Sequence, residues 1–146
     1  MNVTIISPGR KHDPETAALI AEYEKRLRDR FDISWHFPRP DSIDSESASI
    51  ARLLSKKDFV ILLDEHGKDL TSVEFADVLA LVQNRSPKRL VFIIGGAYGV
   101  GEDIKKRANA TISLSSLTFP HMLVRLILTE QLYRASEIMR GGKYHH

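Results

Sequence analysis

The sequence of 146 residues contains no cysteine and no long apolar run. The first absence excludes disulfide frameworks, cysteine nucleophiles and metal sites built on thiolates. The second excludes a membrane-spanning helix, which needs roughly 18 or more consecutive apolar residues. The first residues also lack a basic segment followed by an apolar signal core. We therefore expect a protein of the cytoplasm with no membrane partner.

Neither sign of charge dominates the sequence. The 21 Lys and Arg side chains face 19 Asp and Glu side chains, which leaves a formal net charge of +2. This balance permits an RNA or phosphate ligand, but it falls short of the charge density of a nonspecific nucleic-acid binder. His12, His36 and His66 show no metal-ligand spacing, so we expect no metal site.

Strand-like apolar runs alternate with segments of helical periodicity along the chain. The expected strands cover residues 2–7, 32–37, 58–64, 89–96 and 111–115. The expected helices cover residues 14–30, a short segment around 50–54, and residues 71–84, 102–108 and 120–139, with a polar loop at 38–47. Strands separated by helices predict one α/β domain over residues 1–146, with a mostly parallel sheet of about five or six strands.

Ligands of such folds bind beyond the carboxyl ends of the strands, so the loops after the third, fourth and fifth strands are the informative ones. After the third, Asp64 and Glu65 follow an apolar run, as in the magnesium-binding strand of a P-loop NTPase. The glycine pair with the matching spacing is followed by Glu102 and Asp103 instead of Lys and Ser or Thr, which disfavours a nucleotide hydrolase. The alternative is a buried strand that ends in a solvated turn, with Gly67 supplying backbone freedom.

The other two loops favour a ligand without phosphates. "IIGGAYGVG" (93–101) places glycines directly after a buried strand, which allows a ligand to approach the backbone closely, although a tight turn explains the glycines as well. "SLSSLTFPHMLVR" (113–125) is a polar loop that passes into a helix at Pro120. No Lys or Arg lies between residues 108 and 124, which suits adenosine attached to a sulfonium amino acid better than ATP.

Three segments together resemble one family: "IIGGAYG", "SLSSLTFPHMLVRLILTEQLYRA" and the terminal "IMRGGKYH". They are similar to the RlmH family, SPOUT-superfamily methyltransferases that act on large-subunit ribosomal RNA. The resemblance covers essentially the whole chain. It implies an α/β fold with a C-terminal trefoil knot, S-adenosylmethionine as cofactor, and a homodimer with its site at the subunit interface. The implied reaction is N3-methylation of a pseudouridine in the helix 69 loop of 23S rRNA, on the assembled ribosome. A noncatalytic RNA- or ribosome-binding module with the same fold is the alternative.

The resemblance also implies which residues contact the cofactor: Leu63, Gly95, Leu114, Ser115, Ser116, Leu117, Thr118 and Phe119. The implied reaction removes the N3 proton, and the imidazole of His145 is a candidate to assist. Arg134 is suited to stabilising negative charge on the ring carbonyls, and Glu130 shares its helix face, unless the two form an ordinary surface pair. Tyr144 is suited to stacking on the target base.

Three further expectations concern the surface. The tail after Gly141 and Gly142 is expected to be flexible and to close over RNA at the partner's site. Arg10, Lys11 and Lys143 are candidates for RNA contacts if they flank the cofactor loops. Four apolar residues of the last helix are expected to add a dimer face, unless they pack in the core of the domain: Met122, Leu126, Tyr133 and Ile138.

Overall fold

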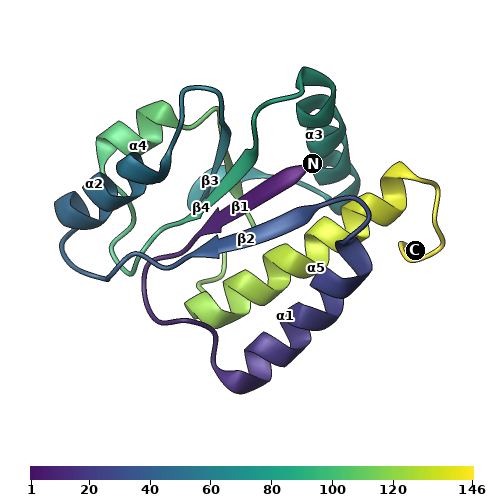
Figure 1. Ribbon diagram of the computed structural model, residues 1–146, viewed down its shortest axis with the longest axis horizontal. Coiled ribbons are helices and arrows are strands. Elements are labelled where there is room, and N and C mark those ends of the chain that lie inside the picture. The colour runs from purple at the N-terminus through teal and green to yellow at the C-terminus, as the bar shows by residue number, and fades with distance from the viewer.

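The computed structural model describes residues 1–146, and strands alternate with helices as expected (Figure 1). The strands are β1 (Asn2–Ile6), β2 (Asp32–His36), β3 (Phe59–Asp69), β4 (Leu90–Ile94) and β5 (Ala110–Ser113). The helices are α1 (Pro14–Leu27), α2 (Ile43–Leu53), α3 (Ser72–Arg85), α4 (Glu102–Arg107) and α5 (His121–Met139).

All five strands join one parallel sheet in the order β2-β1-β4-β3-β5, which confirms the α/β prediction. Helices cover both faces (Figure 1): α1, α3 and α5 pack on one side, and α2 and α4 on the other. Because the strands are parallel, their carboxyl ends meet at one edge of the sheet. The loops that the sequence singles out therefore converge there.

The central strands are buried on both faces, as their uninterrupted apolar runs predict. In β3, Ile61 and Leu63 point into a core shared with α1, α3 and α5. The alternate residues Val60 and Leu62 point into a second, smaller core under α2 and α4. These two layers hold the carboxyl edge of the sheet rigid, which is what a preformed binding site requires.

β3 is longer than predicted, because the segment expected as a solvated turn pairs with β5. After an irregularity in register, Lys68 pairs with Ile112 and Asp69 with Ser113. Gly67 permits this pairing by its lack of a side chain, since a Cβ there would lie 2.7 Å from the backbone of Ile112. Its role is therefore close strand approach, and the predicted role in a turn is wrong.

The predicted loop at 38–47 is also partly wrong, because α2 begins inside it. The Ser42 hydroxyl accepts a hydrogen bond of 3.2 Å from the Ser45 amide and so caps the helix. Glu46, Ser47 and Ile50 are buried on one side of the helix. This face packs against the smaller core and the loop after β4. Burial of these residues stabilises a helix in a segment whose composition is largely polar.

No helix of the structure has the length and apolar character needed to cross a membrane.

Candidate functional site

A cavity of about 880 Å³ opens at the carboxyl ends of β3, β4 and β5. Three segments form its walls: the middle of β3 (62–66), the glycine loop (94–100), and the serine loop with the start of α5 (114–124, without Ser116, Met122 and Leu123). This volume is typical of a small-molecule or cofactor pocket. Segments far apart in the sequence thus meet at the edge where parallel α/β sheets bind ligands.

The cavity gathers the predicted cofactor residues with one exception. Those that line it are Leu63, Gly95, Leu114, Ser115, Leu117, Thr118 and Phe119. Ser116 is exposed and does not line it. The predicted set omits several other apolar or aromatic residues that line the cavity, among them Tyr98 and Val124. Tyr98 lies between glycines and is 81% exposed, so its position inside the glycine loop was the available signal.

The glycine loop folds into a tight turn at the cavity wall. The Gly99 amide donates to the Gly96 carbonyl oxygen at 3.0 Å, and Gly99 has a φ of 82°, which favours glycine. Behind the loop lies the buried carboxylate of Glu46, 2.7 Å from where a Cβ of Gly96 would stand. The structure therefore supports the turn explanation of these glycines, and close approach of a ligand to the loop stays a prediction.

The serine loop is shaped by its own hydroxyl groups. The Ser113 hydroxyl donates to the Ser115 carbonyl oxygen at 3.0 Å, and the Ser115 hydroxyl accepts from the Leu117 amide at 2.9 Å. These bonds turn the chain within a few residues. Leu117 is left 70% exposed at the cavity, where it provides apolar surface with no partner in this chain.

Charges around the cavity are mainly acidic. Asp64, 18% exposed, accepts hydrogen bonds from the His66 amide at 2.8 Å and lies 2.9 Å from His66 Nδ1. Lys105 lines the cavity, but its ammonium group lies 3.2 Å from the Glu102 carboxylate. A polyphosphate would meet carboxylates here without a cluster of free cations, which disfavours the nucleotide-hydrolase alternative.

His121 begins α5 and also lines the cavity. Burial lowers its pKa, and the nearby Arg125 guanidinium lowers it further. Both effects disfavour the charged form of the imidazole, so His121 is poorly suited to act as a cation. No group of three or more His, Asp or Glu side chains is placed to hold a metal ion.

The four predicted catalytic residues form a second cluster. Glu130 Oε1 accepts hydrogen bonds from Arg134 Nε at 3.0 Å, from Arg134 Nη2 at 2.7 Å and from the Tyr144 hydroxyl at 3.1 Å. Arg134 Nη1 lies 3.3 Å from His145 Nδ1, and the guanidinium lies 4.8 Å from the centre of the Tyr144 ring. The structure therefore brings all four together.

The tail is held against α5 instead of lying free. Tyr144 stacks edge-on against Tyr133 with ring centres 4.7 Å apart, and both Tyr144 and His145 are half-buried. Burial raises the pKa of Tyr144 to about 12, with further contributions from Tyr23 and Glu130. The expected flexible tail is thus wrong for Tyr144 and His145, whose polar groups bind the helix.

Within one chain this catalytic cluster lies apart from the cavity. None of its four residues lines the cavity. At about 1.5 Å per residue, Glu130 stands roughly 13 Å along α5 from His121. The chain therefore presents a cavity at one end of α5 and a polar cluster at the other.

Comparisons with known proteins give the family of the chain. The family model described as predicted SPOUT methyltransferase matches residues 1–145. The chain therefore belongs to the SPOUT methyltransferase family, which confirms the resemblance drawn from its motifs.

Among similar proteins, a Bacteroides thetaiotaomicron protein named ribosomal RNA large subunit methyltransferase H is 48% identical over 103 residues, which cover 70% of this chain and 66% of that protein. Proteins of the same name from Christiangramia forsetii and Flavobacterium johnsoniae are 38% and 39% identical, and these alignments cover 100% of this chain and 99% of each relative.

Proposed function

We propose that this protein is an S-adenosylmethionine-dependent methyltransferase that methylates N3 of a pseudouridine in the helix 69 loop of 23S rRNA. The observation that carries the proposal is the cavity, which gathers the glycine and serine loops in a chain of the SPOUT methyltransferase family. The names of the relatives support ribosomal RNA of the large subunit as the substrate.

The residues of the cavity fit the proposed cofactor. Gly95 and its neighbours offer backbone without side chains, and Leu114 and Phe119 offer apolar surface for the faces of an adenine. Asp64 supplies negative charge, which suits a cationic sulfonium and ammonium better than phosphates. When bound, the cofactor supplies an electrophilic methyl group.

The chain's own residues then account for positioning and proton removal. Arg134, held in place by Glu130, is oriented to donate hydrogen bonds to a ring carbonyl and to stabilise its negative charge. His145 beside it is suited to accept the N3 proton. Tyr144 stays protonated over the working pH range because its pKa is raised to about 12, so it acts as an aromatic surface and a hydrogen-bond donor.

A homodimer is part of this proposal, because the catalytic cluster does not reach the cavity of its own chain. A second copy that sets its tail cluster beside this cavity would complete the site. Exposed apolar side chains near the cavity support an interface there: Leu117 is 70% exposed and Leu123 46% exposed. Tyr133 and Ile138 instead pack on the main core, so the dimer face predicted on α5 moves toward the start of that helix.

The trefoil knot and the cytoplasmic location stay predictions.

Two measurements test the proposed function. Calorimetry should show binding of S-adenosylmethionine and no binding of ATP with Mg²⁺. Labelled methyl groups should appear in ribosomes from a strain that lacks the modification. Cofactor binding with no methyl incorporation would favour the noncatalytic ribosome-binding module.

A further inference from the structure

Arg125 is a buried cation without a carboxylate partner. It lies in α5, is 1% exposed, and takes part in none of the ion pairs of the structure. Its guanidinium is held by neutral groups: Nε donates to the Ser7 hydroxyl at 2.9 Å, and Nη1 donates to the Arg10 carbonyl oxygen at 2.8 Å. The Phe37 ring lies 4.8 Å from it. A buried charge without a counter-charge is costly, which calls for an explanation.

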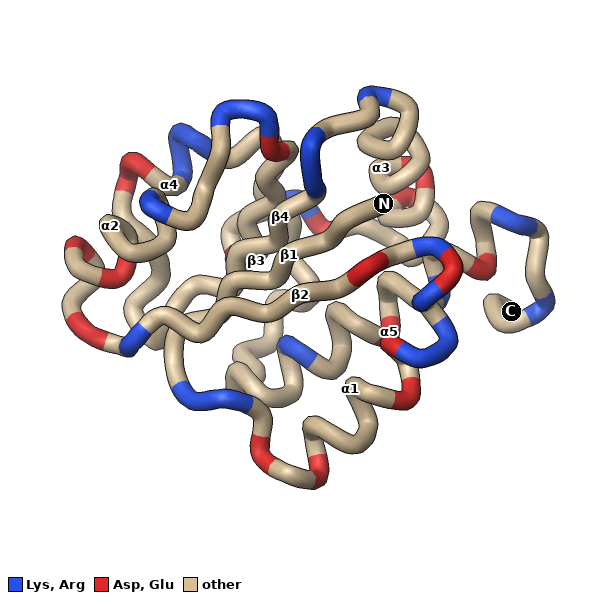
Figure 2. Tube along the Cα trace, viewed as in Figure 1, with Lys and Arg blue, Asp and Glu red and all other residues tan.

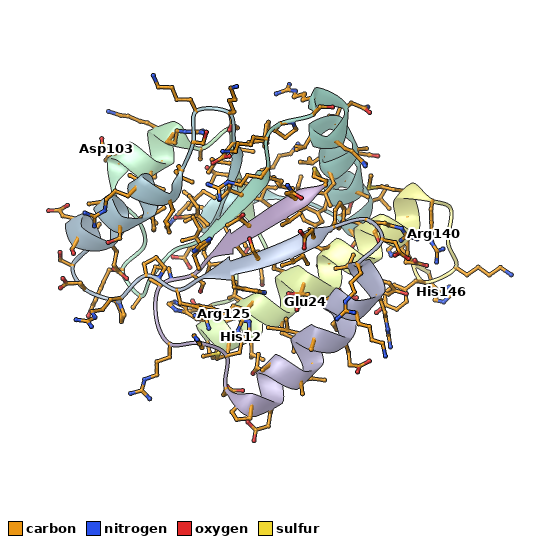
Figure 3. The ribbon with its side chains drawn as sticks, viewed as in Figure 1. His12, Glu24, Asp103, Arg125, Arg140 and His146 are labelled. Carbon is orange, nitrogen blue, oxygen red and sulfur yellow. The ribbon has the colours of Figure 1, made fainter.

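The surroundings of Arg125 do not supply the missing negative charge. Burial lowers its pKa, and Asp13 is the acid whose charge acts in the opposite direction. Asp13 is exposed, and its carboxylate accepts a hydrogen bond from the Thr16 amide at 2.8 Å to cap α1. His12 lies on the same side of the sheet (Figure 3), and its Nδ1 is buried without any hydrogen-bond partner. Burial, and then Arg125, lower the pKa of His12 and keep it neutral.

The β1–α1 loop (residues 7–13), whose Arg10 carbonyl oxygen binds Arg125, adds more positive charge. Arg10 and Lys11 are exposed, and their side chains form no ion pair. In Figure 2 this loop is a basic stretch between β1 and α1. The Gly9 amide donates to the Pro38 carbonyl oxygen at 3.0 Å, which brings the exposed Arg39 next to the loop. Three exposed cations thus lie in chain segments next to one buried cation.

This basic site adjoins the cofactor cavity. His121, which lines the cavity, lies one turn of α5 before Arg125 and is close enough for the charge of Arg125 to lower its pKa. The loop leaves the sheet at the carboxyl end of β1, the same edge at which the cavity opens beside β4. A polyanion that reached the cavity would therefore pass these cations.

We propose that the β1–α1 loop, supported from beneath by Arg125 and flanked by Arg39, binds a phosphodiester of the RNA substrate next to the cofactor cavity. Arg10 and Lys11 contact the phosphate, while Arg125 is a positioning residue that fixes the Arg10 backbone and adds positive potential. This inference rests on the proposed function, since it assigns a subsite for the same RNA. RNA fits better than an acidic protein surface because a closely spaced row of phosphates matches several cations at one edge.

The decisive test is the double variant Arg10→Glu/Lys11→Glu, compared with Lys56→Glu/Lys57→Glu. The control pair is also consecutive, basic and exposed, but it lies in the loop before β3, at the opposite edge of the sheet. Affinity for unmodified ribosomes is measured over a series of KCl concentrations, together with kcat at saturating ribosomes and with affinity for S-adenosylmethionine. We expect Arg10→Glu/Lys11→Glu to bind ribosomes about tenfold or more weakly and to lower the salt slope by about 1–2. Its cofactor affinity and kcat should match wild type, and the control should match wild type throughout.

Equal ribosome affinity of the two double variants would overturn the proposal, as would a loss of affinity with an unchanged salt slope, which would indicate contact with a ribosomal protein. Arg125→Met should also weaken ribosome binding while cofactor affinity is retained. If Arg125→Met fails to fold, the comparison of Arg10→Glu/Lys11→Glu with its control decides the outcome. Absence of methylation by the wild-type protein would contradict the proposed function. The salt dependence of ribosome binding would still test whether the β1–α1 loop binds phosphate.

Discussion

The Tyr144 hydroxyl donates a hydrogen bond of 3.1 Å to Oε1 of Glu130, which joins the end of the chain to the middle of α5. The same oxygen accepts two hydrogen bonds from Arg134, so the tail and the helix share one polar cluster. This relationship gives the tail a defined place before any RNA is present. In the proposed homodimer, this preformed cluster would lie beside the cavity of the partner subunit.

Deletion of residues 143–146 should abolish methylation while folding and cofactor binding are retained. The main core of the fold contains no tail residue, so the shortened protein should fold and should bind S-adenosylmethionine with wild-type affinity. Loss of the Tyr144 hydrogen bond should cost about 1 kcal/mol of unfolding free energy. Methylation of ribosomes should collapse.

The control for this deletion removes His146 alone, which is exposed. That variant should methylate ribosomes at the wild-type rate. Full activity of the longer deletion would move the catalytic roles to Glu130, Arg134 or His121.

Arg134→Lys should reduce kcat by about 100-fold, because a lysine cannot keep the fork of bonds to Glu130 and still donate to a ring carbonyl. Cofactor affinity should not change, since Arg134 does not line the cavity. Steady-state kinetics on ribosomes checks the first expectation and calorimetry the second. Arg140→Lys, which alters the ion pair between the exposed Arg140 and the buried Glu137 near the end of the same helix, should leave kcat unchanged. A similar loss in both variants would argue against a specific role for Arg134.

Gly95→Val should abolish binding of S-adenosylmethionine and leave a folded protein, because a branched side chain fills the cavity wall. Gly95→Ala is the matched control: a Cβ at this position would lie 3.4 Å from Gly99 Cα and 3.6 Å from a Val100 methyl group, ordinary contact distances. Leu114→Asp should weaken binding as well, by placing a charge against the apolar face of the adenine. Normal affinity in Gly95→Val, measured by calorimetry, would remove this assignment of the site.

Two half-buried histidines, His12 and His121, predict how stability depends on pH. Burial, and then Arg125, lower the pKa of His12 and of His121 below the usual 6.5. The unfolded chain therefore binds more protons than the folded one as the pH falls below about 6.5, so the unfolding free energy should decrease on acidification. Each histidine contributes at most about 1.4 kcal/mol per pH unit.

The measurement is urea unfolding between pH 7.5 and 5. His12→Gln/His121→Gln should flatten the decrease, whereas His36→Gln, at an exposed position, should follow the wild-type curve. Identical slopes for wild type and the double variant would show that the two imidazoles charge as readily in the folded protein as in the unfolded one.

Much of the fold was predictable because local signals and tertiary packing agree. The apolar runs of β3 and β4 indicated central strands, and Thr71 with Glu74 forms the capping box that opens α3. Where the prediction failed, distant contacts decide the structure. The second half of β3 is a strand because it pairs with β5, and its composition carries no such signal.

The candidate site was likewise predictable only in part. The glycine and serine loops could be assigned from the sequence, since their spacing and the resemblance pointed to one ligand. The contact of Tyr144 and His145 with α5 could not, because two glycines before them indicate freedom, and the hydrogen bonds to Glu130 and Arg134 exist only in the folded chain. The burial of Arg125 without a carboxylate partner could not be predicted either, since an arginine in a helix usually lies at the surface.

The most direct test of the account is methyl transfer to ribosomes from a strain that lacks the modification, followed by mass spectrometry of helix 69 fragments of 23S rRNA. The account predicts one added methyl group on N3 of a pseudouridine in that loop, dependent on S-adenosylmethionine and absent with the Gly95→Val protein. A folded protein that binds the cofactor but adds no methyl group, or adds it elsewhere in the RNA, would contradict it.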